Sequence, residues 1–422
     1  MSQEQDAVQV LELSLNQQLV GYVSGFQNGR NVLTFAPEFV DDFSRPTLTL
    51  TTHPSYPHAN KLLAKPWVRN QRLHPVLSNL LPEGALRELL AQSLKTHIDN
   101  EFQLFTHLAH DLPGALIAKP LSPNSVPSYV LSDYKGTTVI QPDQASSSLK
   151  FSLAGVQMKF SMKAKDGRYQ LSNSDALGDW IVKTPSTKHA FVPWNEYTAM
   201  RLAKIAGVNI PEIKLIRLDQ LDNLPPINLP NEKYAFAIKR FDRQGERRIH
   251  MEDFAQVLAK YPHEKYKAFN YESIGRIIYQ YSKDSLGDAQ QFARRLLVNI
   301  LLANGDAHLK NWSLLYPDSI TAELCPAYDI VTTRAYMGDE REYALNMART
   351  KQWYNVSFDH FETWAKRADI PWRAIKPQLI DTLDKARSLW PKALQDLPMQ
   401  DEQKTDLIAH WKSLQSDFSI NV

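Results

Sequence analysis

The sequence predicts an α+β fold of two lobes, in which a β-rich part precedes a mostly helical part. Short β-rich runs bounded by turn residues fill the first 240 residues, with only two helical patterns among them. Beyond that point, apolar residues recur at the spacing of amphipathic helices. We therefore expect a β-rich N-terminal subdomain at 1–110, a small lobe at 111–240 and a large helical lobe at 241–422.

The N-terminal subdomain is predicted from alternation and turn signals. The runs VQVLELSL, QLVGYVSGF and PTLTLTT alternate or are rich in strand-forming residues, and QNGRN is a turn signal between strands. HPVLSNLLPEGALRELLAQSL then predicts a lead-in loop and an amphipathic helix. Pro82 and Glu83 suit the first turn of that helix, which tolerates proline and favours acidic residues.

The predicted small lobe holds several strands and one helix. SLKFSLAGVQMKFSMKAKDGRYQL predicts strands joined by a loop and by a DG turn, and DWIVKTP predicts another short strand. VPWNEYTAMRLAKIAGVNIP predicts a helix that ends at Gly207, before Pro211. YAFAIKRFDRQ predicts a strand that leaves the sheet at a polar segment.

The predicted large lobe is dominated by helical patterns, which are YESIGRIIYQYS, DAQQFARRLLVNILLA, FDHFETWAKRA and LIDTLDKARSLW. A β-rich lobe followed by a helical lobe is the order of the bilobal protein-kinase-like fold. Fold order alone does not indicate function, so function has to be argued from particular residues.

Composition excludes several classes of protein. The 422 residues carry a net charge of +2, so no global charge signal demands nucleic acid or a membrane surface. The single cysteine, Cys325, excludes a disulfide framework and a cysteine-based metal site within the chain. The first residues do not form a signal peptide, and no apolar run is long enough to span a bilayer. We expect a soluble, cytoplasmic protein.

A polar octet, NGDAHLKN, interrupts an apolar run within residues 303–316. It places Asp306 five residues before Asn311, and Asp329 follows 18 residues after Asn311. Phosphoryl transfer uses one aspartate to orient the attacking hydroxyl, and an asparagine with a second aspartate to hold Mg²⁺ on the nucleotide phosphates. Such pairs are also common in loops, so an NGD turn with His308 as a helix cap is the alternative.

Lys183 lies within the apolar strand WIVKTP, where a lysine is costly unless its ammonium reaches a partner. It is expected either to contact nucleotide phosphates or to extend to water at the strand end. Glu196 in the following helix is either its acidic partner or an ordinary glutamate near a helix N-terminus.

FSLAGVQMKF lies between two predicted strands, where a loop covering phosphates would be placed. Its one glycine, Gly155, does not complete a recognised phosphate-loop pattern. Backbone N–H groups from Ala154 to Gln157 can still form an anion-binding nest, helped by Lys159, and an ordinary β-turn is the alternative.

KRFDRQGERR, at 239–248, holds five basic side chains and suits nucleotide, phosphate or nucleic-acid contact, or a solvated loop. The absence of an H-E-x-x-H motif or Cys/His cluster argues against catalytic zinc. The absence of G-x-S-x-G argues against an α/β-hydrolase.

Taken together, the ordered set SLAGVQMK, WIVKTP, NEYTAMRLAKIAG, AIKRFDR, NGDAHLKN and PAYDI resembles the HipA family of bacterial Ser/Thr kinase toxins. LVGYVSGF and SNLLPEGALRELL resemble the first subdomain of that family, so the resemblance covers most of the chain. Its specificity comes from the ordered set rather than from any one motif. It implies a protein kinase that uses ATP and Mg²⁺, and an N-terminal subdomain that contacts an antitoxin.

The resemblance also implies roles for individual residues. Asp306 matches the catalytic aspartate, Asn311 and Asp329 match the magnesium ligands, and Lys183 matches the phosphate-contacting lysine. The rest of the implied ATP site consists of the phosphate loop, the adenine-binding segment, which acts largely through its backbone, and further residues of the catalytic region: Ala154, Gly155, Val156, Gln157, Met158, Lys159, Lys239, Arg240, Phe241, His308, Leu309, Lys310 and Tyr328.

Ser152 matches the serine that these kinases autophosphorylate, with Ser146, Ser147 and Ser148 as competing acceptors. A dianion on Ser152 would repel ATP phosphates, eject the loop and inactivate the kinase. Met158 and Lys239 stand where the best-known member of the family has acidic residues, so its nucleotide affinity is not transferred to this chain.

The resemblance implies a HipB-like helix-turn-helix antitoxin as partner, with which the toxin acts as corepressor on operator DNA. It implies glutamyl-tRNA synthetase as substrate and growth arrest as the outcome. Two alternatives are a small-molecule phosphotransferase of related fold and a non-catalytic corepressor. Lys385 and Arg387 are either DNA contacts or solvated helix charges.

Overall fold

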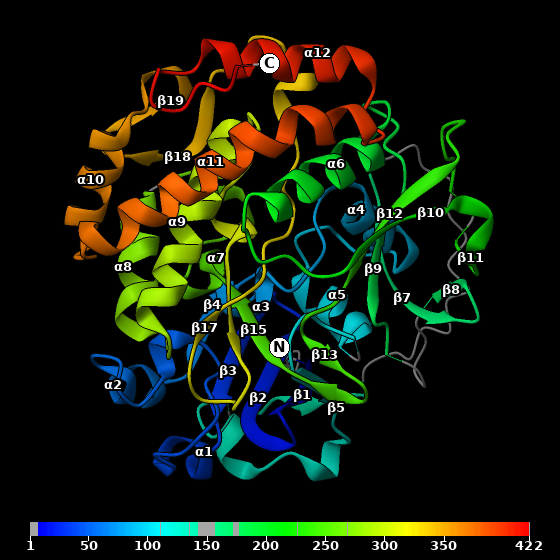
Figure 1. Ribbon diagram of the computed structural model, residues 1–422. Coiled ribbons are helices and arrows are strands. Elements are labelled where there is room, and N and C mark those ends of the chain that lie inside the picture. Colours follow the sequence, from blue (N-terminus) through cyan, green and yellow to red (C-terminus); the bar gives the residue numbers. More distant parts are fainter. Residues whose placement is uncertain are drawn as a thin grey trace.

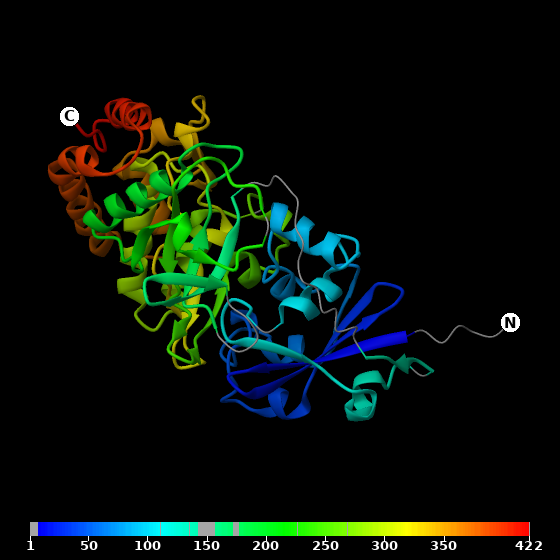
Figure 2. The same cartoon turned by 90° about the vertical axis from the view of Figure 1, so that its right-hand side faces the viewer.

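The computed structural model describes residues 7–109, 111–134, 136–141, 157–171, 177–225, 227–267 and 269–421. An N-terminal sheet lies at the bottom of Figure 1, a second sheet at its right, and most helices of the C-terminal part at its upper left. In Figure 2 the N-terminal sheet and the C-terminal helices lie at opposite ends of the molecule. The architecture is a mixed α+β fold, as predicted, while the three-part division remains a prediction.

The N-terminal sheet has the order β4-β3-β2-β1-β5, and β6 pairs with β1 in parallel while the other pairs are antiparallel. Alternating apolar residues of the strands pack against α3, α4 and α5 in one core. The bounds are β1 Ala7–Leu15, β2 Gln18–Phe26, β3 Arg30–Phe35, β4 Trp67–Asn70, β5 Leu116–Pro120, β6 Thr138–Val139, α1 Pro37–Asp41, α2 Ala59–Leu63, α3 Pro75–Ser78, α4 Gly84–Ser93 and α5 Glu101–Leu108.

Two predictions for this region are wrong. PTLTLTT is not a strand but leads into a 3₁₀ turn at Leu50–Thr52, because contacts with other segments use its backbone. The Leu50 N–H donates to a carboxylate oxygen of Glu252, and the Thr47 N–H donates to the Ser319 carbonyl at 2.8 Å. The predicted helix begins at Gly84, so Glu83 precedes its first turn.

The second sheet has the order β10-β12-β9-β7-β8-β11. Four of its strands, β7, β8, β9 and β12, follow the predicted runs, and the DG turn joins β7 to β8, whereas β10 and β11 were not predicted. Helix α6 packs on this sheet, and Gly207 follows it in the left-handed conformation, with φ of 91°, as its predicted end requires. The bounds are β7 Lys159–Lys165, β8 Arg168–Leu171, β9 Trp180–Lys183, α6 Val192–Ile205, β10 Ile213–Arg217, β11 Leu221–Asp222 and β12 Tyr234–Lys239.

The C-terminal part is mostly helical, and the predicted helical patterns correspond to α8, α9, α10 and α11. Large aromatic side chains, including Trp312, Trp364 and Trp390, are fully buried in its core. The bounds are α7 Phe254–Val257, α8 Tyr271–Tyr281, α9 Ser285–Leu301, α10 Phe358–Arg367, α11 Trp372–Asp396, α12 Asp401–Ser413, β13 Arg243–Gln244, β14 Arg247–Arg248, β15 His250–Asp253, β16 Ser313–Tyr316, β17 Glu323–Leu324, β18 Glu342–Met347 and β19 Thr350–Gln352. Within the described residues, no helix is both long and apolar enough to cross a membrane.

Glu252 on β15 connects the N-terminal part to the C-terminal part. Its carboxylate is fully buried and accepts hydrogen bonds from the Leu50 backbone N–H at 2.7 Å and from the Tyr316 hydroxyl. Burial raises the pKa of Glu252 to about 7, because the charged form is disfavoured away from water. The native protein therefore holds a proton on this carboxyl at pH values where an unfolded chain has released it.

We expect Glu252→Gln to become more stable relative to wild type as pH rises from 5 to 8. The folded pKa lies above the unfolded one, so wild type loses about 2–3 kcal/mol of unfolding free energy across this window, which a neutral amide does not lose. Buried histidines with lowered pKa values, such as His250 and His410, act in the opposite direction, so only the difference between the two proteins is diagnostic. Urea unfolding of both proteins at several pH values measures this difference in unfolding free energy. A difference that stays constant with pH would contradict the raised pKa of Glu252.

Candidate active site

The polar octet lies between a helix and a strand that hold both of its ends. Helix α9 ends at Leu301, the 3₁₀ turn Leu309–Asn311 follows, and β16 begins at Ser313. The side chains of the octet fix its own backbone. The Asn304 side chain accepts from the Asp306 N–H at 3.1 Å, and the Asn311 amide donates to the Asp306 carbonyl at 2.7 Å. The Asp306–Asn311 spacing therefore corresponds to one closed, hydrogen-bonded loop.

Asp306 presents its carboxylate at the surface of this loop, where it is about half exposed. Oδ1 accepts a hydrogen bond from the Tyr266 hydroxyl and lies 3.8 Å from Nε2 of His308. Burial lowers the pKa of His308 to about 4, so its imidazole is neutral at pH 7. Oδ1 of Asp306 thus already accepts one hydrogen bond from a hydroxyl, the kind of bond that an acceptor hydroxyl would make.

Lys183 is the centre of a buried ion-pair cluster. Its ammonium, only 5% exposed, pairs with Glu196 of α6 and with Asp329. Lys159 also reaches Asp329, with 3.0 Å between Nζ and Oδ2. The structure thus confirms that Glu196 is the acidic partner of Lys183, the first of the two readings that the sequence allowed.

Charge compensation keeps Lys183 and Asp329 ionised, while burial raises the pKa of Glu196. Burial opposes the charge of Asp329, but Lys159 and Lys183 outweigh it and hold the pKa of that carboxyl well below its usual range. Burial likewise opposes the charge of Lys183, but Asp329 and Glu196 raise its pKa. Asp329 therefore carries a negative charge that the ammonium groups of Lys159 and Lys183 compensate.

The three residues predicted to hold adenine, Lys239, Arg240 and Phe241, make different kinds of contact. The Lys239 N–H donates to the Glu212 carbonyl at 2.9 Å, and the Phe241 ring lies 5.7 Å from that of Tyr328. The Arg240 guanidinium is buried in ion pairs with Asp242 and Asp111. Its side chain thus holds the protein together, and its N–H donates to the Asp179 carbonyl at 2.9 Å, so the predicted nucleotide contact would use the Arg240 carbonyl.

The predicted phosphate loop is described only in part. Met158 is buried, and its N–H donates to the Thr184 hydroxyl at 3.3 Å. Nε2 of Gln157 is buried and has no hydrogen-bond partner among the described residues. The other predicted phosphate-loop and acceptor positions lie outside the described residues: Ala154, Gly155, Val156, Ser152, Ser146, Ser147 and Ser148.

Lys310 faces the N-terminal part of the protein. Its ammonium donates to the Asn79 carbonyl at 3.0 Å and lies 3.0 Å from Glu83 and 3.7 Å from Asp253. The buried Leu309 donates its N–H to the Lys265 carbonyl at 3.2 Å. The Lys310 side chain is therefore an anchor, and its carbonyl accepts from the Tyr328 hydroxyl at 2.8 Å, so the predicted nucleotide contact would use its N–H.

Sequence reasoning missed Tyr266, Asn79 and Glu83 as neighbours of the loop. Asn79 and Glu83 belong to SNLLPEGALRELL, a stretch that the sequence singled out without giving these side chains a role. No motif surrounds Tyr266. Such long-range neighbours depend on packing between parts of the chain, which spacing does not encode.

We expect Glu83→Gln to lower the free energy of unfolding by about 1–3 kcal/mol, since Lys265 and Lys310 both lose their shared carboxylate. Burial opposes the charge of Glu83, but these lysines lower its pKa to about 2, below the usual 4.5. The stabilisation is therefore present above pH 4.5 and is lost as pH falls toward 2. The urea concentrations at the midpoint of unfolding, compared at pH 7, measure the loss of stability in Glu83→Gln. The exposed Glu88 of α4 supplies the control Glu88→Gln, and equal midpoints for the two variants would contradict the role.

The described residues fit a magnesium ion bound together with nucleotide phosphates. Asp329 is ionised, and Asn311 offers its carbonyl oxygen because its NH₂ group donates to Asp306. No group of three or more acidic, His or Cys side chains within the described residues could hold a metal alone, as expected for a cation that takes other ligands from phosphates and water. Buried Nδ1 of His308 and Nε2 of Gln157 are polar atoms without partners among the described residues, which suits a site completed by a ligand.

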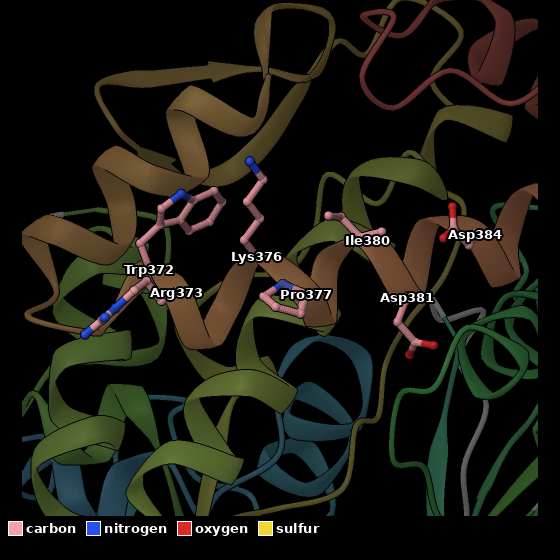
Figure 3. A pocket seen from close by; sticks show the side chains of 7 residues that line it. All are labelled: Trp372, Arg373, Lys376, Pro377, Ile380, Asp381 and Asp384. Atoms are coloured by element: carbon pink, nitrogen blue, oxygen red, sulfur yellow. The ribbon is translucent and has the colours of Figure 1, made fainter.

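A hollow on the surface of α11 lies apart from these residues. Figure 3 shows that its lining comes from successive turns of one helix, and none of the lining residues is a predicted site residue. They are Trp372, Arg373, Lys376, Pro377, Ile380, Asp381 and Asp384. The chemistry of this protein is therefore sought at the octet and the Lys183 cluster.

Comparisons with known proteins agree over most of the chain. Residues 151–390 match the family model of the HipA-like C-terminal domain, and residues 11–119 match that of the HipA N-terminal domain. A Sinorhizobium fredii protein named as a kinase, Y4dM, is 37% identical over 395 residues, which cover 93% of this chain and 94% of that protein. The serine/threonine-protein kinase toxin HipA of Shewanella oneidensis is 25% identical over 370 residues, which cover 80% of this chain and 81% of the toxin.

A solved structure extends the agreement to the fold. It contains Shewanella oneidensis HipA with HipB and operator DNA, and it matches 96% of this chain and 97% of that chain with a TM-score of 0.71 and 21% identity. The kinase-like α+β fold predicted from the sequence is thereby confirmed. From these matches and the arrangement of the site, the chain belongs to the HipA family of serine/threonine kinases.

Proposed function

We propose that this protein transfers the γ-phosphoryl group of ATP to a serine or threonine hydroxyl of a protein, and that it is the toxin of a toxin–antitoxin pair. The observation that carries the proposal is the Lys183 cluster with Glu196 and Asp329, in a chain whose Asp306 lies on a closed loop with Asn311. These are the parts that phosphoryl transfer needs in a kinase-like fold.

In the proposed mechanism, Asp306 accepts the proton of the attacking hydroxyl. Lys183 is held in place by Glu196 and contacts nucleotide phosphates. Asn311 and Asp329 would hold Mg²⁺, which neutralises charge on the phosphate oxygens when it is bound with ATP. Tyr328, whose hydroxyl donates to the Lys310 carbonyl at 2.8 Å, keeps the segment before Asp329 against the loop.

We also propose control by autophosphorylation at Ser152, with Ser146, Ser147 and Ser148 as competing sites. The phosphate would place a dianion in the loop predicted to cover ATP phosphates, and repulsion between like charges would inactivate the kinase. Phosphopeptide mapping after incubation with ATP and Mg²⁺ distinguishes these positions.

The solved relative with HipB and operator DNA supports two further proposals. One is a HipB-like helix-turn-helix antitoxin that contacts the N-terminal subdomain. The other is corepression, in which this protein joins the antitoxin on operator DNA. The proposed substrate is a translation component, glutamyl-tRNA synthetase.

To test this proposal, the purified protein is incubated with Mg²⁺, labelled ATP and each of several phosphate acceptors. Glutamyl-tRNA synthetase should gain phosphate on a serine or threonine, and sugars, choline and aminoglycosides should not. Turnover of one of these small hydroxyl compounds, without any protein product, would contradict the proposal and indicate a small-molecule phosphotransferase.

A further inference from the structure

Tyr266 makes a direct hydrogen bond to the predicted catalytic carboxylate. It follows the 3₁₀ turn Pro262–Glu264, and its hydroxyl donates to Oδ1 of Asp306. The side chain is 44% exposed, and its ring stands edge-on to that of His308 with 4.9 Å between centroids. An exposed aromatic residue is thus bonded to the carboxylate oxygen that the acceptor hydroxyl would need in the proposed chemistry.

The bond has the same chemistry as the bond expected of a substrate. In phosphoryl transfer, the acceptor hydroxyl donates to this aspartate before it attacks. Burial and the neighbouring Asp306 raise the pKa of Tyr266, so its phenol stays protonated and remains a donor. A substrate hydroxyl that approaches Oδ1 therefore meets a donor already in place.

The turn that carries Tyr266 is fastened on two sides. The Lys265 ammonium lies 2.8 Å from Glu83 of the N-terminal part, and the Lys265 carbonyl accepts from the Leu309 N–H of the catalytic loop at 3.2 Å. The same ammonium lies 5.7 Å from the centre of the Tyr266 ring. These contacts fix the backbone beside Tyr266, so displacing its side chain requires only rotation about side-chain bonds.

We propose that Tyr266 occupies the acceptor subsite as a resident mimic of the substrate hydroxyl, which a serine or threonine side chain must displace. The proposal rests on the proposed function, because it concerns the acceptor side of the same site. It identifies Tyr266 as a determinant of acceptor affinity and leaves nucleotide binding unaffected. A positioning role, in which the phenol holds Asp306 in a productive orientation, predicts the opposite effect on turnover.

The experiment uses the full chain with Tyr266→Phe, which keeps the ring and removes only the hydroxyl. Release of ADP from Mg²⁺ and ATP is measured with water as acceptor, and phosphate transfer is measured with dephosphorylated casein as a generic protein acceptor. Losing a hydrogen bond to a charged group should raise ADP release and lower the KM for casein by about 10-fold, with the KM for ATP unchanged. Thermal unfolding of the variant shows that it is folded.

The matched control is Tyr129→Phe, because Tyr129 is 36% exposed and lies beside Tyr22 of the N-terminal sheet. It should leave both activities at the wild-type value. Unchanged or reduced turnover in Tyr266→Phe, beside an active wild type, overturns the proposal, and so does phosphate found on Tyr266 by mass spectrometry. A wild type no more active than Asp306→Asn overturns the proposed function as well, so the two failures are distinguishable.

Discussion

Replacing Lys183 with methionine should reduce phosphate transfer by at least about 100-fold and lower the free energy of unfolding by about 3–5 kcal/mol. Both effects have one cause. The ammonium is buried between Glu196 and Asp329, so its removal leaves the buried Glu196 carboxylate without this partner and Asp329 paired with Lys159. The same change removes the cation predicted to contact ATP phosphates. No other single substitution considered for this site should affect activity and stability together.

Transfer assays with labelled ATP and urea unfolding of the same samples measure both effects. Lys214→Met is the matched control, because Lys214 lies on β10 of the same sheet and its ion pair with Glu212 is half exposed. That variant should change the unfolding free energy by less than about 1 kcal/mol and leave transfer intact. A Lys183→Met protein with wild-type activity would exclude Lys183 from the reaction, whatever its effect on stability.

Asp306→Asn should reduce transfer by about 10²- to 10⁴-fold, the range expected when a group that accepts a proton in the transition state is removed. Because the carboxylate is half exposed and the loop is held by its backbone and by Asn304 and Asn311, the thermal midpoint and nucleotide binding should stay close to wild type. The exposed Asp384 of α11 supplies the control Asp384→Asn, which should leave both transfer and stability unchanged.

The same substitution separates the toxin from a non-catalytic corepressor. Expression of wild type should arrest growth, and expression of Asp306→Asn should not, while repression of the operator by the complex with the antitoxin should persist in both. Growth arrest by the Asp306→Asn protein would mean that phosphate transfer does not cause toxicity.

Short-range patterns predicted much of the fold. Alternation predicted β1 and β2, the DG turn predicted the β7–β8 hairpin, and the 3.6-residue period predicted α8 and α9, because each depends on residues close in sequence. The strand prediction for PTLTLTT is wrong for the opposite reason. Its alternation is that of a strand, but distant groups, the Glu252 carboxylate and the Ser319 carbonyl, take up its backbone donors.

In the candidate site, too, some features could be predicted from the sequence and others depend on contacts between distant residues. A lysine in an apolar strand requires a partner, and Glu196 in the following helix was one of two readings that the sequence allowed. The direction of the Lys310 side chain, toward Asn79 and Glu83, had no such signal, because the basic residues of a polar loop have many possible partners. Arg240 is similar, since a run of basic residues does not reveal which member is buried against Asp242.

We infer that Asp306, Lys183, Asn311 and Asp329 act together to transfer phosphate from ATP. The most direct measurement is incorporation of labelled γ-phosphate into protein by the purified full chain, with Mg²⁺ and with the metal chelated, beside Asp306→Asn under the same conditions. We predict incorporation into serine or threonine by wild type with Mg²⁺ only, and close to none by Asp306→Asn. Equal incorporation by the two proteins, or none by a folded, nucleotide-binding wild type with any acceptor, would contradict the claim.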